Sequence, residues 1–159
     1  MAADDLLAFE ISLHALAGDA AAAGRYRDAW GEWPTLAVPH AALAVPMAVA
    51  FDDALERLGR LERMYAEPDG SFVWVSSRAG ASWQVDGNAC ERQGRVLLVD
   101  LKGSCPEPCF DRLLAAFGWP GQALMMQLVR AAVFLAEEDF RRHARCRGAA
   151  RDGNIGPAG

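Results

Sequence analysis

The chain contains one lysine, Lys102, and the other fifteen cationic side chains are arginines. An ammonium group differs from a guanidinium group in hydration, shape and the ease with which its pKa shifts, so a lone lysine is a candidate functional group. Lys102 follows Asp100 by two residues in the segment Val-Asp-Leu-Lys-Gly. Asp86 precedes both, on the other side of Arg92-Gln93-Gly94, a sequence typical of a hairpin turn.

The length of this turn decides whether the three side chains meet. A three-residue turn with Gly94 in the left-handed conformation places Asp86 directly opposite Asp100, with Lys102 on the same face. A two-residue turn, Gln93-Gly94, would separate the carboxylates, because a slip of one residue reverses every side chain. The alternation of apolar residues in both strands favours the three-residue turn.

Two carboxylates that face each other repel unless a cation or a proton lies between them. Oxygen ligands at Asp86 and Asp100 suit Mg²⁺, and Lys102 could then hold a water or meet a phosphate oxygen. The arrangement of these three residues therefore predicts a magnesium site that acts on a phosphodiester.

Residues 51–130 resemble the core of the PD-(D/E)XK nuclease superfamily, in which an Asp on the second strand precedes a D/E-x-K motif on the third. The resemblance implies that Asp86 and Asp100 bind the metal and that Lys102 activates or orients the nucleophile. It also implies a helix-borne acid, which would be Glu56 or Glu62. Two positions depart from the family pattern, since Val85 replaces its proline and Asp100 replaces its commoner glutamate.

A simpler interpretation makes these polar residues the solvated face of a one-sided sheet, with Lys102 pairing to a neighbouring carboxylate. The leading functional prediction is then a non-catalytic cytoplasmic domain that binds a protein partner or self-associates. Trp30 and Trp33, in a Pro-rich segment, either anchor that partner or cover the sheet from inside. The basic run 141–147 either complements a helix dipole or meets an acidic or phosphate-bearing partner.

The four cysteines are too few and too irregular for a disulfide framework, which favours a reducing cytoplasm. Cys105, Cys109, His143 and Cys146 supply the number of ligands that a structural zinc needs, although their spacing is wrong for a zinc knuckle. Buried or incidental cysteines are the alternative, and the sequence leaves this question open.

Composition bounds the remaining classes of function. A chain of 159 residues forms one domain, and a net charge of −5 gives no general attraction to nucleic acid, which is a partner only under the nuclease alternative. The N-terminus carries acids where a signal peptide carries basic residues. The longest apolar stretch, 35–51, contains His40 and two prolines and falls short of a bilayer span, so we expect no membrane association.

These patterns predict an α+β fold in which a mainly antiparallel sheet of three or more strands, with a central hairpin, packs against helices. An Ala- and Pro-rich segment (1–50) wraps a core (51–146), and a disordered tail (147–159) follows. Alternating or β-branched residues predict strands, and periodic apolar residues predict helices. The expected strands are 6–16, 71–76, 82–91 and 95–103; the expected helices are 19–30, 51–65, 111–117 and 137–145; residues 122–130 stay open between helix and strand.

Overall fold

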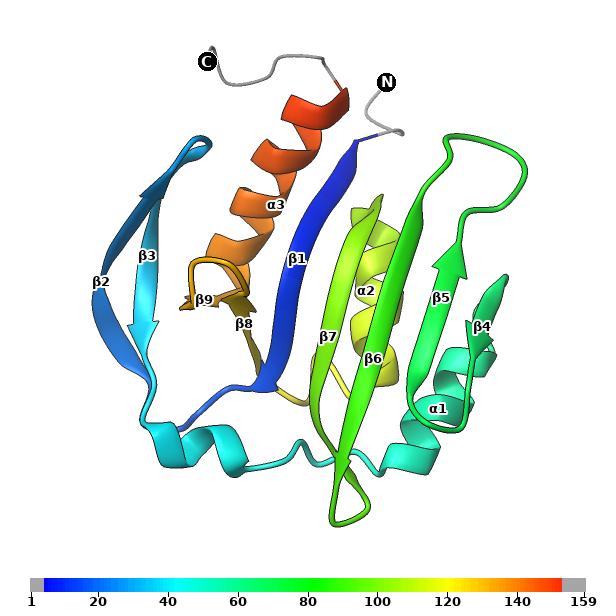
Figure 1. Cartoon of the computed structure of the whole chain (residues 1–159), viewed down its shortest axis with the longest axis horizontal. Coiled ribbons are helices and arrows are strands. Elements are labelled where there is room, and N and C mark those ends of the chain that lie inside the picture. The colour runs from blue at the N-terminus through cyan, green and yellow to red at the C-terminus, as the bar shows by residue number, and fades with distance from the viewer. Residues whose placement is uncertain (1–4, 153–159) are drawn as a thin grey trace.

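The computed structural model of the chain describes residues 5–152, which form one continuous antiparallel sheet with helices packed against it (Figure 1). The strands are β1 (Leu6–Ala15), β2 (Ala21–Asp28), β3 (Gly31–Ala37), β4 (Met64–Ala66), β5 (Ser71–Val75), β6 (Gln84–Arg92), β7 (Arg95–Pro106), β8 (Leu124–Leu128) and β9 (Val133–Ala136). The helices are α1 (Phe51–Gly59), α2 (Glu107–Ala116) and α3 (Glu137–Asp152), and a short 3-10 helix spans His40–Ala44. This arrangement confirms the α+β class.

The strand order is β2-β3-β9-β8-β1-β7-β6-β5-β4, so β1 lies in the middle of the sheet. Its alternating residues drive this position, because Leu7, Phe9, Ile11 and Leu13 all point into the core and are buried. The N-terminal segment was expected to wrap the core. Its first strand instead forms the centre of the sheet, and β2 and β3 form one end of the same sheet.

One expectation for the N-terminal segment is wrong. Residues 19–30 were expected to form a helix because Ala has a high helix propensity, yet they contain strand β2. Trp33-Pro34 is also part of regular structure, because Pro34 lies inside β3, opposite Arg25. A proline is tolerated in a strand at a position where its missing N–H is not needed for pairing.

The second half of the chain follows the sequence pattern more closely. Helix α1 begins at Phe51 as expected but ends at Gly59, and the residues beyond it form β4 instead of a further helical turn. Residues 124–128 resolve the open question as strand β8. Helix α3 continues to Asp152, so residues 147–152 of the expected tail are helical. Residues 153–159 lie outside the described part of the chain.

On the side of β1 where β8 lies, the strands of the sheet pair over only part of their length. Strand β8 pairs only with the second half of β1, from Ile11 to Ala15, and β3 meets β9 only at Leu36 and Phe134. Helix α3 occupies the space that these short pairings leave between β1 and β3 (Figure 1). Gly148 makes this possible, because a Cβ atom there would lie 1.7 Å from the carbonyl oxygen of Leu6.

Candidate functional site

The hairpin of β6 and β7 places Asp86 opposite Lys102 and Asn88 opposite Asp100. The prediction that Asp86 lies opposite Asp100 is therefore wrong. The turn has two residues, Gln93-Gly94, and the register shifts past Cys90 so that Leu97 has no partner. The two-residue turn alone would move the polar side chains of one strand to the opposite face of the sheet. The β-bulge adds one residue to β7 and reverses this shift, so the polar side chains still share one face.

Lys102 has a closer relationship with β1 than with its own hairpin. Its Nζ atom lies 4.0 Å from the Oε2 atom of Glu10, the residue opposite it on β1. Asp100 lies opposite Ser12, whose hydroxyl donates a hydrogen bond of 2.5 Å to its Oδ1 atom. The charges of Asp86, Lys102 and Glu10 therefore alternate across three neighbouring strands, as the solvated-face interpretation expects.

The helix acids are placed on α1 and just beyond it. Glu56 accepts a hydrogen bond of 2.9 Å from Arg60, one helical turn along, and Glu62 is exposed beyond the end of the helix. Within residues 5–152, no group of three or more His, Cys, Asp or Glu side chains is arranged to hold a metal ion. The magnesium nuclease stays a prediction that this geometry does not test.

The four possible zinc ligands lie in different surroundings. Cys105 is buried on β7, and burial raises the pKa of its thiol well above the usual value. Cys109 is half-buried on α2 and Cys146 is exposed on α3. His143 is occupied by an aspartate, because its Nε2 atom lies 2.7 Å from the Oδ2 atom of Asp28.

A second site, of which the sequence marked only Trp30 and the basic run 141–147, lies where α3 meets β1 and the β2–β3 hairpin. It is a cleft of about 160 Å³, which we call the α3 cleft. It is lined by Glu10, Tyr26, Asp28, Trp30, Leu128, Val129, Arg130, Ala131, His143 and Arg147. These residues come from four separate parts of the chain, so no local motif could have revealed the cleft.

Asp28 and His143 form the wall of the cleft. Burial opposes ionisation of Asp28, but hydrogen bonds from the Trp33 indole, from His143 and from the backbone N–H of Trp30 together hold its pKa below the usual range. Burial lowers the pKa of His143, and the attraction of Asp28 only partly offsets this. At neutral pH the pair is therefore an aspartate that accepts from a neutral imidazole.

The two tryptophans pack around this histidine, with ring centres 5.6 Å (Trp30) and 5.1 Å (Trp33) from the imidazole. Trp33 is buried, which fits the expectation that it covers the sheet from inside. Trp30 is half-buried, and the guanidinium carbon of Arg147 lies 5.6 Å from its ring centre. Trp30 therefore remains at the rim of the cleft, under a cationic side chain.

The charged groups of the cleft are incompletely paired. Arg130 approaches the Oε2 atom of Glu10 only to 3.6 Å, which is too far for a hydrogen bond. No ion pair joins Arg147 to any carboxylate of the described side chains. Burial, together with the charges of Arg151 and Arg130, lowers the pKa of Arg147.

Three buried polar atoms of cleft residues have no hydrogen-bond partner within the described chain: Glu10 Oε2, Trp30 Nε1 and His143 Nδ1. Because the Nε2–H group of His143 donates to Asp28, its Nδ1 atom is an acceptor, as is Glu10 Oε2, whereas Trp30 Nε1 is a donor. Buried polar groups are nearly always paired, so these three atoms can accept hydrogen bonds from, or donate them to, water or a ligand in the cleft.

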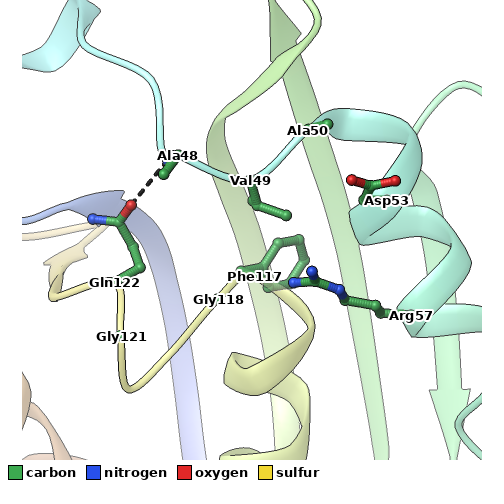
Figure 2. A pocket seen from close by; sticks show the side chains of 9 residues that line it. All are labelled: Ala48, Val49, Ala50, Asp53, Arg57, Phe117, Gly118, Gly121 and Gln122. Atoms are coloured by element: carbon green, nitrogen blue, oxygen red, sulfur yellow. Dashed lines mark hydrogen bonds between the residues drawn. The ribbon is translucent and has the colours of Figure 1, made fainter.

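A larger hollow of about 480 Å³ lies between α1 and the loop that follows α2 (Figure 2). The amide oxygen of Gln122 accepts a hydrogen bond of 2.9 Å from the backbone N–H of Ala48, and Arg57 extends from α1 toward Phe117. The charged side chains here, Asp53 and Arg57, are exposed and solvated. This hollow lacks the buried, unpaired polar atoms that mark the α3 cleft.

No protein-family model, curated protein or solved structure matched the chain. None of the helices described is long and apolar enough to cross a membrane.

Proposed function

We propose that the chain is a non-catalytic binding module that takes part of a partner protein into the α3 cleft. The observation that carries the proposal is the set of three buried, unpaired polar atoms around this cleft, in Glu10, Trp30 and His143. An unpaired buried group costs about 1–3 kcal/mol, which a partner that completes its hydrogen bond would recover.

The size of the cleft favours a protein partner over a metabolite. Sites for small molecules usually measure about 300–1,000 Å³ and enclose most of the ligand. The α3 cleft has a volume of about 160 Å³, which suits one amino-acid residue whose remaining chain lies across the surface. The four cysteines are free, which suits the reducing cytoplasm where we expect the module to work.

Selection of displayed random peptides on the immobilised protein tests the proposal. Val129 lines the cleft and is 44% exposed, so Val129→Trp should obstruct the cleft without disturbing the core. Val73 is 37% exposed on β5, on the face of the sheet that carries Asp86 opposite it, and Val73→Trp is the matched control. We expect selected peptides to lose binding to the Val129 variant and to keep binding to the Val73 variant.

Two results would overturn the proposal. Peptides that bind the wild type and the Val129→Trp variant equally would show that the cleft is not the binding site. Loss of binding only in the Val73→Trp variant would instead place the partner on the outer face of the sheet. Thermal unfolding of each variant verifies that the substitution leaves the fold intact.

A further inference from the structure

Two arginines of the α3 cleft, Arg130 and Arg147, are available to bind an anion. Arg147 has no carboxylate at ion-pair distance among the described side chains, and Arg130 is only loosely paired with Glu10. Both arginines line the cleft. A guanidinium presents two parallel N–H groups, which match the two oxygens of a carboxylate.

The acids of the same cleft limit the charge of that anion. Glu10 and Asp28 line the cleft with the two arginines, so the four groups have no net charge. With no net charge around it, a phosphate dianion gains little net Coulomb attraction to offset the desolvation of its second charge, whereas a monoanion loses the hydration of only one charge. The surroundings of Arg147 therefore favour a carboxylate over a phosphate.

The unpaired acceptors add a second requirement. Glu10 Oε2 and His143 Nδ1 both need a donor, whereas Trp30 Nε1 and Arg147 need an acceptor. The last residue of a polypeptide offers both within a few bonds, since its α-carboxylate accepts and its backbone N–H donates. An Asp or Glu side chain places its carboxylate farther from the backbone donor.

We propose that the α3 cleft recognises the C-terminal carboxylate of its partner, an inference that rests on the proposed binding function. Arg147 and Arg130 bind the carboxylate, and the N–H group of the last residue lies toward Glu10. The guanidinium carbon of Arg147 lies 5.6 Å from the Trp30 ring centre, so a carboxylate bound to Arg147 changes the surroundings of the indole. The Trp30 indole is therefore the natural reporter of binding.

Two pools of N-acetylated, fully randomised tetrapeptides test this inference, one with free C-terminal carboxylates and one with C-terminal amides. The readout is the Trp30 indole cross-peak in the ¹H–¹⁵N spectrum, assigned with Trp30→Phe. We expect the acid pool to shift this peak at roughly tenfold lower concentration than the amide pool, because a charge-assisted hydrogen bond is about twice as strong as a neutral one.

Variants of α3 assign the effect to one arginine. Arg147→Gln should remove the preference for the acid pool, and Arg147→Lys, which keeps the charge and loses the fork, should retain part of it. Arg151→Gln is the matched control, because Arg151 is exposed on the same helix and does not line the cleft. Thermal unfolding confirms that each variant is folded.

The outcomes separate the two proposals. Equal shifts from both pools that disappear in Val129→Trp would overturn recognition of the carboxylate and leave the binding function standing. A preference for the acid pool that survives Arg147→Gln would also overturn it. No response to either pool at millimolar concentration would overturn both.

Discussion

The Nε2 atom of His143 lies 2.7 Å from the Oδ2 atom of Asp28 and so joins α3 to the end of the β2–β3 hairpin. Both side chains are almost fully buried, at 4% and 10% exposure. The same carboxylate accepts hydrogen bonds from the Trp33 indole (3.0 Å) and from the backbone N–H of Trp30 (2.9 Å). One aspartate therefore holds together the wall of the α3 cleft.

Replacing this aspartate should destabilise the protein strongly. Asp28→Ala leaves the donors of Trp30, Trp33 and His143 without an acceptor, so we expect a loss of about 2–4 kcal/mol at pH 7 in urea unfolding. The pKa of Asp28 is lower in the folded state than in the unfolded state. The ionised carboxylate therefore stabilises the fold fully above the unfolded pKa of about 4, and this stabilisation is lost as the pH falls through the folded-state pKa. The difference in the free energy of unfolding between wild type and Asp28→Asn should therefore decrease below about pH 4. A difference that stays constant with pH would contradict this role of Asp28.

The buried histidines should make the free energy of unfolding decrease as the pH falls below about 6.5. Burial lowers the pKa of both His14 and His143, although Asp100 and Asp28 respectively oppose the shift. Below the unfolded pKa of about 6.5 the unfolded chain binds protons that the folded chain does not, so acid favours unfolding. Urea unfolding from pH 8 to pH 5 measures this slope.

Single variants assign the slope to these residues. His14→Gln and His143→Gln should each flatten it, whereas His40→Gln, at an exposed position, is the matched control. If all three variants keep the wild-type slope, the buried imidazoles do not cause it.

Two helical glycines should respond oppositely to alanine. A Cβ atom at Gly148 would lie 1.7 Å from the Leu6 carbonyl oxygen, so Gly148→Ala must push α3 away from β1 at a cost of about 3 kcal/mol or more. Gly59 in α1 has no atom within 4 Å of that position, and Gly59→Ala should stabilise by about 0.5–1 kcal/mol. Thermal unfolding of both variants checks this, and equal effects would mean that α3 is not seated as described.

The sequence predicted those strands whose residues alternate in polarity or are mainly β-branched and aromatic. Strand β1 was recognised because its apolar residues lie at every second position, and β5 because Phe72, Val73, Trp74 and Val75 are β-branched or aromatic. Strand β2 was missed, because Ala21, Ala22 and Ala23 have the local propensity of a helix. Only its pairing with β3 makes this segment a strand, and pairing is a tertiary property.

The candidate sites show the same limit. The alternation of side chains along the hairpin placed Asp86, Asp100 and Lys102 on one face. The bulge at Leu97 could not be predicted, because it depends on which residue packs into the core, and that residue is Val96. The α3 cleft was out of reach for another reason. Glu10, Asp28, Arg130 and Arg147 are far apart in the chain, and α3 brings them together only because β8 is shorter than β1.

Removing Arg141 should destabilise the contact between α2 and α3. Its side chain is 10% exposed and pairs with Glu107 at 2.8 Å, Asp111 at 2.7 Å and Glu137 at 3.0 Å. Arg141→Met leaves three neighbouring carboxylates without their shared cation. Because these carboxylates are 27–42% exposed and Glu107 keeps Arg145, we expect a loss of about 2–3 kcal/mol. Arg141→Lys should retain only part of the lost stability, since one ammonium group cannot make the several directed hydrogen bonds of a guanidinium. Chemical unfolding measures both, and a loss below about 1 kcal/mol would show that water replaces the arginine.

Lys102 and Asp100 separate the binding module from the magnesium nuclease. The Lys102 side chain is 69% exposed and lies 4.0 Å from Glu10, so Lys102→Gln should change the free energy of unfolding by less than about 1 kcal/mol. Asp100→Ala leaves the buried Ser12 hydroxyl without its acceptor and should cost about 1–2 kcal/mol. Under the binding proposal, millimolar Mg²⁺ should leave the melting temperature of the wild type and of both variants unchanged. If Mg²⁺ instead raises the melting temperature of the wild type and not of Asp100→Ala, the result would favour the nuclease. A ligand that binds the folded state stabilises it, and the loss of this effect in Asp100→Ala would identify Asp100 as a metal ligand.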